Sequence, residues 1–295
     1  MKLQKQLTAA LAGAALFGSV ANAEIPLTDE LSAYGYIDMA LTDGEATGDT
    51  STTVAEFELG FAFTPTESAW SAVAELSFDG AGVTDFETVT ISYQYSDSLS
   101  FTFGNILSYQ GFETYDATGL YQFSYAGAGN TPLYSAGYAV GASADGSMGD
   151  FDYGVWVGDT DSGTNSFEYL VAYNGIENLT VKVIYADDPG YETVNVWAAY
   201  DYGDFTFAVE TVETENGTGA DVLDVQTALV YYAMGKAGIT VRFADGEYAG
   251  AGYEKFTISP SYSFSDNVFG LVEFSSEELD GVDNDTAAVE LIYSF

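Results

Sequence analysis

The chain has 295 residues, no cysteine, no histidine and a formal net charge of −39. Without cysteine there are no disulfide bridges, and without histidine and cysteine the usual catalytic base and the soft metal ligands are missing. The negative charge also disfavours nucleic acid as a partner, because it repels the phosphate backbone. Composition therefore argues against an enzyme, and we expect no catalytic, cofactor-binding or metal-binding residues.

The N-terminus has the pattern of a secretory signal peptide. Lys2 and Lys5 precede an apolar run over residues 7–20, which ends at the small-residue stretch 21–23. A retained membrane helix is the alternative, but glycines interrupt the run and it is shorter than the roughly 20 residues that a span needs. We predict a cleaved signal peptide over residues 1–23 and one mature domain over residues 24–295. That domain carries 45 acidic and 4 basic residues, a net charge of −41.

From about residue 31 onward, the sequence consists of stretches of about ten residues in which apolar and polar side chains alternate, the pattern of transmembrane β-strands. In the last stretch, residues 287, 289, 291, 293 and 295 are apolar, while Glu290 and Ser294 fall between them. The predicted strands lie near residues 32–41, 53–64, 70–78, 86–95, 99–106, 133–143, 150–158, 166–174, 179–187, 191–201, 204–213, 222–233, 237–245, 254–264, 268–276 and 285–295. An even number of strands, sixteen, favours a bacterial outer-membrane barrel.

The connections between these stretches alternate in length. Tight turns are predicted at residues 65–69, 96–98, 144–149, 175–178, 202–203, 234–236 and 265–267. Most of the others are longer and acidic, as at residues 43–49, 159–161, 213–221 and 277–285. Carboxylates in such loops suit divalent cations, but solvation is the simpler interpretation. The alternation predicts an all-β, antiparallel, up-and-down transmembrane β-barrel of about 16 strands.

A soluble β-sandwich is the structural alternative, since it also has alternating strands. Aromatic residues near strand ends favour the membrane barrel, because aromatic girdles mark the two membrane interfaces. The residues expected in these girdles are Tyr93, Tyr95, Tyr185, Tyr200, Tyr231, Tyr262, Phe264, Tyr293 and Phe295.

Charged residues on the polar parity should line the barrel interior, because a lipid-facing Lys or Arg costs about 2–4 kcal/mol at mid-membrane. Simple hydration of each charge, without a role in transport, is the alternative. The predicted pore-lining residues are Glu56, Glu58, Glu75, Glu168, Lys182, Asp201, Glu210, Asp224, Arg242, Lys255, Glu273 and Glu290.

The longest connection, residues 107–132, is too rich in aromatic residues for a solvated tether. We predict that it folds into the barrel as a constriction, with Glu113 and Asp116 facing the pore. An external lid without a transport role is the alternative. The residues assigned to this constriction loop are Tyr109, Glu113, Tyr115, Asp116 and Tyr121.

Two motifs carry a family resemblance: GFETYDATGLYQFSY at residues 111–125 and YGYID at residues 34–38. With them the chain resembles the OmpL-like β-barrel porins of Gram-negative outer membranes. The resemblance implies a passive outer-membrane porin and does not supply a substrate or named binding residues. The terminal Tyr-Ser-Phe also resembles the C-terminal signal that the barrel assembly machinery reads, which makes that machinery a partner through Phe295.

We therefore predict an outer-membrane porin of a Gram-negative bacterium that lets small hydrophilic solutes and ions diffuse. The excess of acids over bases inside the barrel predicts a weak preference for cations. Outer-membrane lipid is the other expected partner, and a homotrimer is an assembly that a sixteen-stranded pore permits. The alternative function is an adhesin or receptor barrel that acts through its acidic external loops.

Overall fold

The computed structural model describes residues 24–44, 51–79, 84–113, 116–134, 137–159 and 165–295. The predicted signal peptide lies outside them. The described residues form sixteen long antiparallel strands and the two-residue strand β1 (Ile25–Pro26), which pairs with β2. The long strands are β2 (Leu31–Gly44), β3 (Ser51–Phe63), β4 (Trp70–Asp79), β5 (Thr84–Ser96), β6 (Leu99–Leu107), β7 (Tyr138–Met148), β8 (Phe151–Asp159), β9 (Asn165–Ile176), β10 (Leu179–Asp188), β11 (Tyr191–Tyr202), β12 (Phe205–Asn216), β13 (Asp221–Met234), β14 (Ala237–Tyr248), β15 (Ala251–Ser265), β16 (Val268–Leu279) and β17 (Val282–Ser294).

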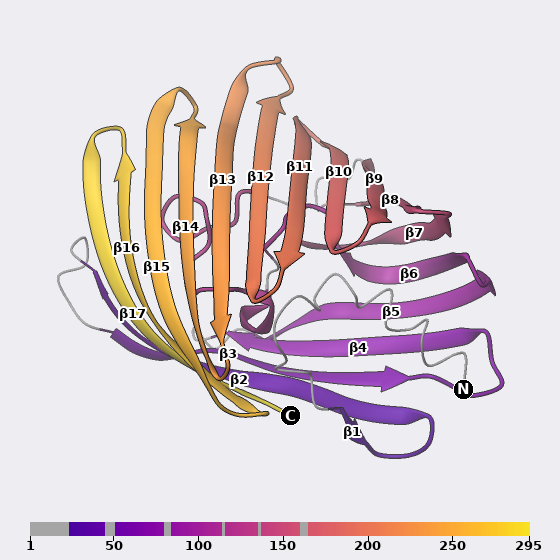
Figure 1. Ribbon diagram of the computed structural model, residues 1–295. Helices are drawn as coiled ribbons and strands as arrows, with labels where there is room; N and C mark the ends of the chain where they lie inside the picture. The colour runs from indigo at the N-terminus through magenta and orange to yellow at the C-terminus, as the bar shows by residue number, and fades with distance from the viewer. Residues whose placement is uncertain (1–23, 45–50, 80–83, 114–115, 135–136, 160–164) are drawn as a thin grey trace.

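Each long strand pairs with its neighbours in the chain, and β17 pairs with β2 to close the ring (Figure 1). The closing register runs from Gly44 opposite Thr286 to Tyr36 opposite Ser294. Gly35 and Phe295 extend it by exchanging two backbone hydrogen bonds of 2.9 Å. The predicted transmembrane barrel is confirmed, because closure leaves no sheet edge with unpaired backbone groups. Among the described residues, no helix is long and apolar enough to cross a membrane.

The two faces of the wall differ as the alternation predicts. In β12, Phe205, Phe207 and Val209 are exposed on the outside, while Thr206 and Ala208 between them are buried, as is Glu210 after them. Large apolar side chains on the outer face suit contact with hydrocarbon, which contradicts the soluble β-sandwich.

Aromatic residues cluster on the outer face near the tight turns. Trp70 packs on Tyr93 with ring centroids 4.6 Å apart, and Phe205 packs on Tyr232 at 4.4 Å. The girdle assignment of Tyr231 was wrong: its ring lies 5.3 Å from that of Tyr121, inside the barrel. The outward aromatic residue at this level of β13 is therefore Tyr232.

Strand β7 is displaced from its predicted range. It runs from Tyr138 to Met148 instead of residues 133–143, and the turn after it contains Gly149 at φ 65°. Leu133 and Tyr134, which suggested the start of a strand, are buried in a cluster with Val212 inside the barrel. Their apolar character therefore reflects packing within the connection before β7.

The connections on the side opposite the tight turns are shorter than predicted in the second half of the chain. Residues 213–221 and 277–285 lie mostly within strands, and Asp280 and Gly281 connect β16 to β17. Their positive φ angles, 53° and 74°, suit a tight hairpin turn of the Asp-Gly kind. Much of the acidity assigned to loops thus lies on strand ends.

A substitution at Gly35 tests how the barrel closes between β17 and β2. A Cβ at this position would overlap the carbonyl oxygen of Glu58 and lie 3.1 Å from Cζ of Phe295. We expect Gly35→Ala to lower the free energy of unfolding by about 1–3 kcal/mol through this overpacking. Urea unfolding of the refolded barrel in lipid vesicles measures the loss. Gly252→Ala is the matched control, since a Cβ there has nothing within 4 Å. Equal stability of both variants would contradict the role of Gly35.

Candidate functional site

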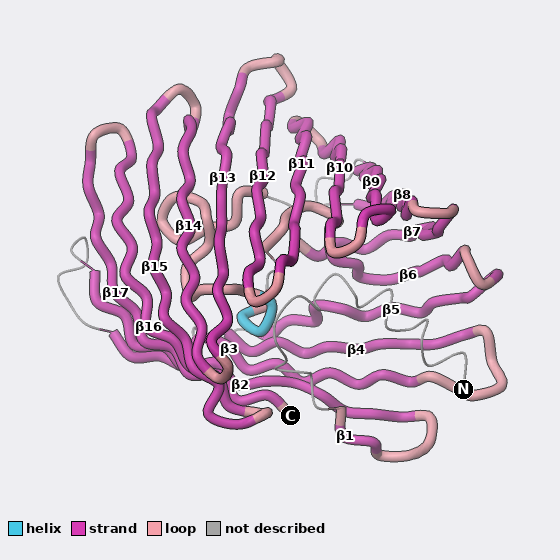
Figure 2. Tube along the Cα trace, in the orientation of Figure 1, coloured by secondary structure: helices cyan, strands magenta, loops and turns pink. Residues whose placement is uncertain are grey.

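The connection between β6 and β7 spans residues 108–137, and we call its described residues (108–113, 116–134 and 137) the inner loop, which lies inside the barrel. Its only described helical turn is the 3-10 helix η2 (Ala117–Gly119), which Figure 2 shows enclosed by the strands. Side chains from β9 to β16 bind the backbone of the loop at points along its length. The described part of the loop is therefore bound to inward-facing side chains of the barrel wall.

The first attachment lies at the start of the inner loop. Glu168 of β9 accepts hydrogen bonds from the Ser108 hydroxyl and the Tyr109 backbone N–H, both at 2.7 Å. The Tyr109 hydroxyl donates to Oδ1 of Asp145 on β7 at 2.5 Å. Two predicted residues, Tyr109 and Glu168, thus meet here.

The second attachment uses an amide and a carboxylate of the wall. Gly111 donates its N–H to Oδ1 of Asn195 at 2.9 Å, and Phe112 donates its N–H to Oε1 of Glu210 at 2.9 Å. Asn195 also donates to Glu210 at 2.8 Å, so the two wall side chains hold each other in place. The loop backbone here satisfies wall groups that would otherwise be buried without partners.

The third attachment is the buried ion pair between Arg242 of β14 and Glu113 of the loop. Arg242 also donates to the backbone carbonyl of Tyr125 at 2.6 Å, and Glu113 accepts the N–H of Ala126 at 3.0 Å. The side chains of Arg242 and Glu113 are 2% and 7% exposed, so neither charge has water as a substitute partner. The ion pair therefore fastens two separate parts of the loop to β14.

The fourth attachment lies on β15 and β16. Lys255 donates to the same Tyr125 carbonyl at 2.9 Å and pairs with Glu277 at 3.6 Å. Glu273 accepts the N–H of Ser124 at 3.1 Å. Glu277 was placed in a loop by the sequence prediction, because β16 extends further than its alternation indicated.

Apolar contacts fill the space between these attachments. Tyr121 is buried among Trp197, Leu229 and other wall residues, and its carbonyl accepts a 2.7 Å hydrogen bond from Thr240. Phe112 packs edge-on against Trp197 with centroids 5.5 Å apart. The inner wall of this half of the barrel is thus partly apolar, which a simple polar-interior pattern does not anticipate.

Eleven of the twelve predicted pore-lining residues face the interior. The exception is Asp224, which is exposed on the outer face opposite Glu213 and Glu247. Its neighbours Leu223 and Val225 face inward and are apolar because they pack under the inner loop. The prediction of which side chains of β13 face inward was therefore wrong at Asp224. Of the loop residues, Tyr115 lies outside the described residues.

The basic residues lie on one side of the interior. Lys182 lies 4.8 Å from the ring of Trp197, while Arg242 and Lys255 hold the loop. On the other side of the ring, β3, β4 and β5 carry Glu56, Glu58, Glu75 and Glu87, whose side chains face the interior. Burial and the charges of Glu75, Glu87 and Glu56 raise the pKa of Asp116, in the inner loop, to about 8. Acids therefore dominate the side of the barrel that the loop does not fasten to.

Sequence reasoning missed Asp38 and Glu87 as interior acids. Asp38 is 3% exposed on β2, a strand whose alternation gives no clear facing. Glu87 shares its parity with outward Val89 in a regular strand. The register between β4 and β5 shifts between Ala74 and Leu76, and this bulge turns Glu87 inward. The trace that this bulge leaves in the sequence is a charged residue, Glu87, on the apolar parity of its strand.

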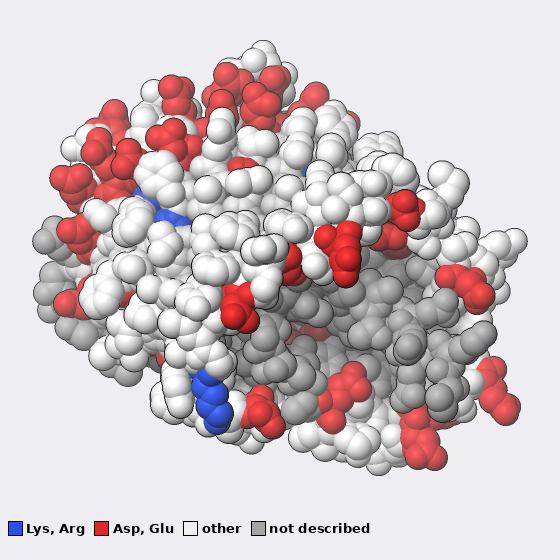
Figure 3. Space-filling model, viewed as in Figure 1, with Lys and Arg blue, Asp and Glu red and all other residues white. Residues whose placement is uncertain are grey.

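Outward acidic residues form a band on the strand ends opposite the tight turns. Asp245, Glu254, Glu278 and Asp283 are exposed and stand opposite one another on β14 to β17. Figure 3 shows acidic side chains gathered along this upper edge, above a band with few charges. Directly opposed like charges repel each other, so these ends of the strands need water or counterions around them.

Comparison with known proteins gives structural likenesses only. No family model matches the sequence, and no curated protein matches it. A loop L8 deletion mutant of OmpT, an outer membrane protein of Vibrio cholerae, is 13% identical with a TM-score of 0.73, covering 90% of this chain and 99% of that chain. The anion-selective porin from Comamonas acidovorans is 15% identical with a TM-score of 0.68, covering 90% and 99%. A mutant of the Rh. blastica porin is 17% identical with a TM-score of 0.67, covering 90% and 100%. The chain has the fold of these outer-membrane barrels.

The ion pair of Arg242 and Glu113 predicts a stability effect. We expect Arg242→Met to cost about 3–5 kcal/mol, because it leaves a buried carboxylate without its partner. Urea unfolding in vesicles measures this cost, and limited proteolysis should show new cleavage within the inner loop. Lys236→Met is the control, since Lys236 lies in an exposed turn and, among the described residues, its side chain donates to the Phe264 carbonyl alone, at 3.4 Å. An Arg242→Met protein as stable and as protease-resistant as the control contradicts this role.

Proposed function

We propose that this protein is an outer-membrane porin through which small hydrophilic solutes and ions diffuse. The observation that carries the proposal is a charged loop held inside a closed sixteen-stranded barrel by hydrogen bonds from the wall. The interior of a barrel of about 8 strands can be filled by side chains alone, whereas barrels of 16 to 18 strands are wide enough for an aqueous channel. The inner loop narrows that channel, and its attachments keep it from swinging out.

A weak preference for cations is part of the proposal. Acidic side chains facing the interior outnumber the three basic ones, and two of these three, Arg242 and Lys255, are already paired with Glu113 and Glu277. The four interior glutamates of β3 to β5 (Glu56, Glu58, Glu75 and Glu87) form what we call the acidic wall. None of them forms an ion pair with a described Lys or Arg. Rings and walls of carboxylates favour the passage of cations.

The remaining assignments are proposals of the same kind. The protein is exported with cleavage after Ala23, inserts through the barrel assembly machinery by way of Phe295, and resides in outer-membrane lipid. One solved form of the Vibrio cholerae OmpT is described as a trimer, and a homotrimer is the assembly we propose here. Membership of the OmpL-like porins stays a prediction that rests on the two sequence motifs. The absence of enzymatic activity also stays a prediction.

Planar bilayer recording tests transport. We expect the refolded chain of residues 24–295 to give stepwise conductance, and a variant with a shortened inner loop to give larger steps. The reason is that removing loop residues widens the narrowest part of the channel. A correctly folded barrel without steps would exclude the porin and favour the adhesin or receptor. Equal step size in the two proteins would show that the loop is not the constriction.

Reversal potentials under a salt gradient test selectivity. Glu75→Gln removes one inward charge, whose carboxylate accepts a 2.5 Å hydrogen bond from Tyr34, and should lower the preference for cations. Asp224→Asn is the matched control, because it removes an outward charge and should leave the reversal potential unchanged. A preference for anions in the wild-type protein would refute this part of the proposal.

A further inference from the structure

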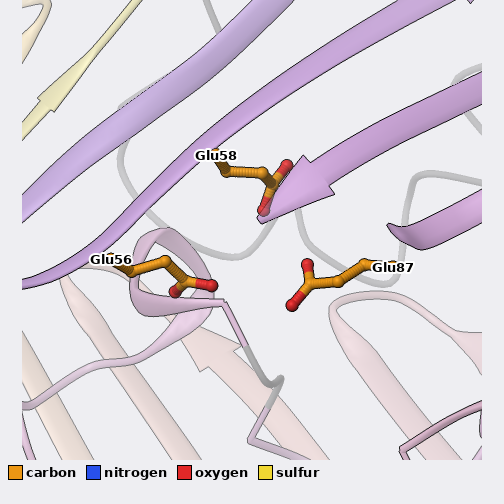
Figure 4. Close-up of side chains that lie close together, drawn as sticks. All are labelled: Glu56, Glu58 and Glu87. Atoms are coloured by element: carbon orange, nitrogen blue, oxygen red, sulfur yellow. The ribbon is translucent and has the colours of Figure 1, made fainter. Parts of the chain in front are cut away.

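Three carboxylates of the acidic wall meet at one point inside the barrel. Glu56 and Glu58 lie two residues apart on β3, and Glu87 reaches them from β5 (Figure 4). One oxygen of each lies within 4.8 Å of the others. We call these three residues the glutamate cluster.

The glutamate cluster contains oxygens that lack a hydrogen-bond partner. Glu58 is 4% exposed, and its Oε2 is buried without a hydrogen bond. Oε2 of Glu87 is buried without a hydrogen bond as well. Buried carboxylate oxygens that find no donor are costly, and a bound cation is one way to satisfy them.

No basic side chain serves the cluster. The mature chain has four basic residues, and all four are described. Each is engaged elsewhere: Lys182 over Trp197, Lys236 at the Phe264 carbonyl, Arg242 with Glu113 and Lys255 with Glu277. Three neighbouring carboxylates therefore have no protein cation to neutralise them.

The surrounding structure holds the cluster in place. The Tyr36 hydroxyl donates to Glu56 at 2.6 Å, and the Ser77 hydroxyl donates to its other oxygen at 2.7 Å. On the far side, the bulge turns Glu87 inward, and the Asn105 amide donates to the carbonyls of Phe86 at 3.1 Å and Glu87 at 2.5 Å. Hydrogen bonds that orient carboxylates in this way are typical of ligands around metal ions.

We infer that the glutamate cluster binds a calcium ion. Calcium takes oxygen ligands at about 2.4 Å, so two ligand oxygens of one ion lie at most about 4.8 Å apart, which the three carboxylates satisfy. A site made only of oxygen suits this hard cation, and waters complete its coordination. Magnesium fits less well because it demands near-ideal octahedral geometry and keeps its water. This inference departs from the expectation that the chain has no metal-binding residues.

A bound calcium ion connects β3 to β5 across β4. The ion also removes negative charge from the acidic wall, so its occupancy lowers the cation preference proposed above. Binding itself does not depend on whether the barrel conducts.

Isothermal titration calorimetry with calcium chloride tests the site, using refolded protein in detergent micelles after treatment with a chelator. We expect one site of defined affinity in the wild-type protein. Glu58→Gln and Glu87→Gln should each weaken binding by about tenfold or more, because each removes one charged ligand. Asp224→Asn, which removes a carboxylate from the outer face, is the matched control and should bind as the wild type does.

Thermal unfolding distinguishes a glutamate cluster that binds calcium from one whose carboxylates are neutralised by protons shared among them. Calcium should raise the melting temperature of the wild type and the control, and at the same concentration it should raise that of Glu58→Gln by less. If one variant fails to refold, the other still gives the comparison. Equal binding by the wild type and both variants would overturn the inference, since the ion would then lie elsewhere. Absence of wild-type binding at millimolar calcium would overturn it too, and neither result bears on the bilayer recordings.

Discussion

The constraint behind this structure is that backbone N–H and C=O groups within a membrane must find partners in the protein. The sixteen strands meet that constraint only because β17 pairs with β2, and Gly35 allows the two ends of the domain to come together there. Closure fixes which parity of each strand faces outward. It also creates an interior too wide for wall side chains to fill, which the inner loop partly occupies.

The interior is divided by charge. On β9 to β16, carboxylates and amides of the wall are satisfied by backbone N–H groups of the inner loop, and Arg242 and Lys255 neutralise Glu113 and Glu277. On β3 to β5, carboxylates face each other without basic partners. One half of the barrel therefore holds the loop, while the other half carries carboxylates that form no ion pair with a described Lys or Arg.

Much of the fold could be predicted from the sequence, because a wall between lipid and a polar interior imposes strict alternation. The structure contains all sixteen predicted strands, and most of the charged residues predicted to line the interior do face it. The errors have physical causes. Leu133 and Tyr134 resemble a strand but pack under the loop, and Asp224 shares its parity with outward residues because Leu223 and Val225 face an apolar part of the interior. Glu87 turns inward at a bulge. The partners of the loop, such as Asn195 for Gly111, depend on contacts between distant residues, which one sequence does not reveal.

The attachments of the inner loop also bear on the order of events during folding. Its wall partners lie later in the chain: Glu210 is 98 residues beyond Phe112, Arg242 is 129 beyond Glu113, and Glu273 is 149 beyond Ser124. Contacts of such long sequence separation form slowly, since the intervening chain must first be ordered. The loop can therefore dock only after the C-terminal strands have assembled. Until then Phe112 and Tyr121 lack the wall residues of β11 to β13 against which they pack in the folded barrel.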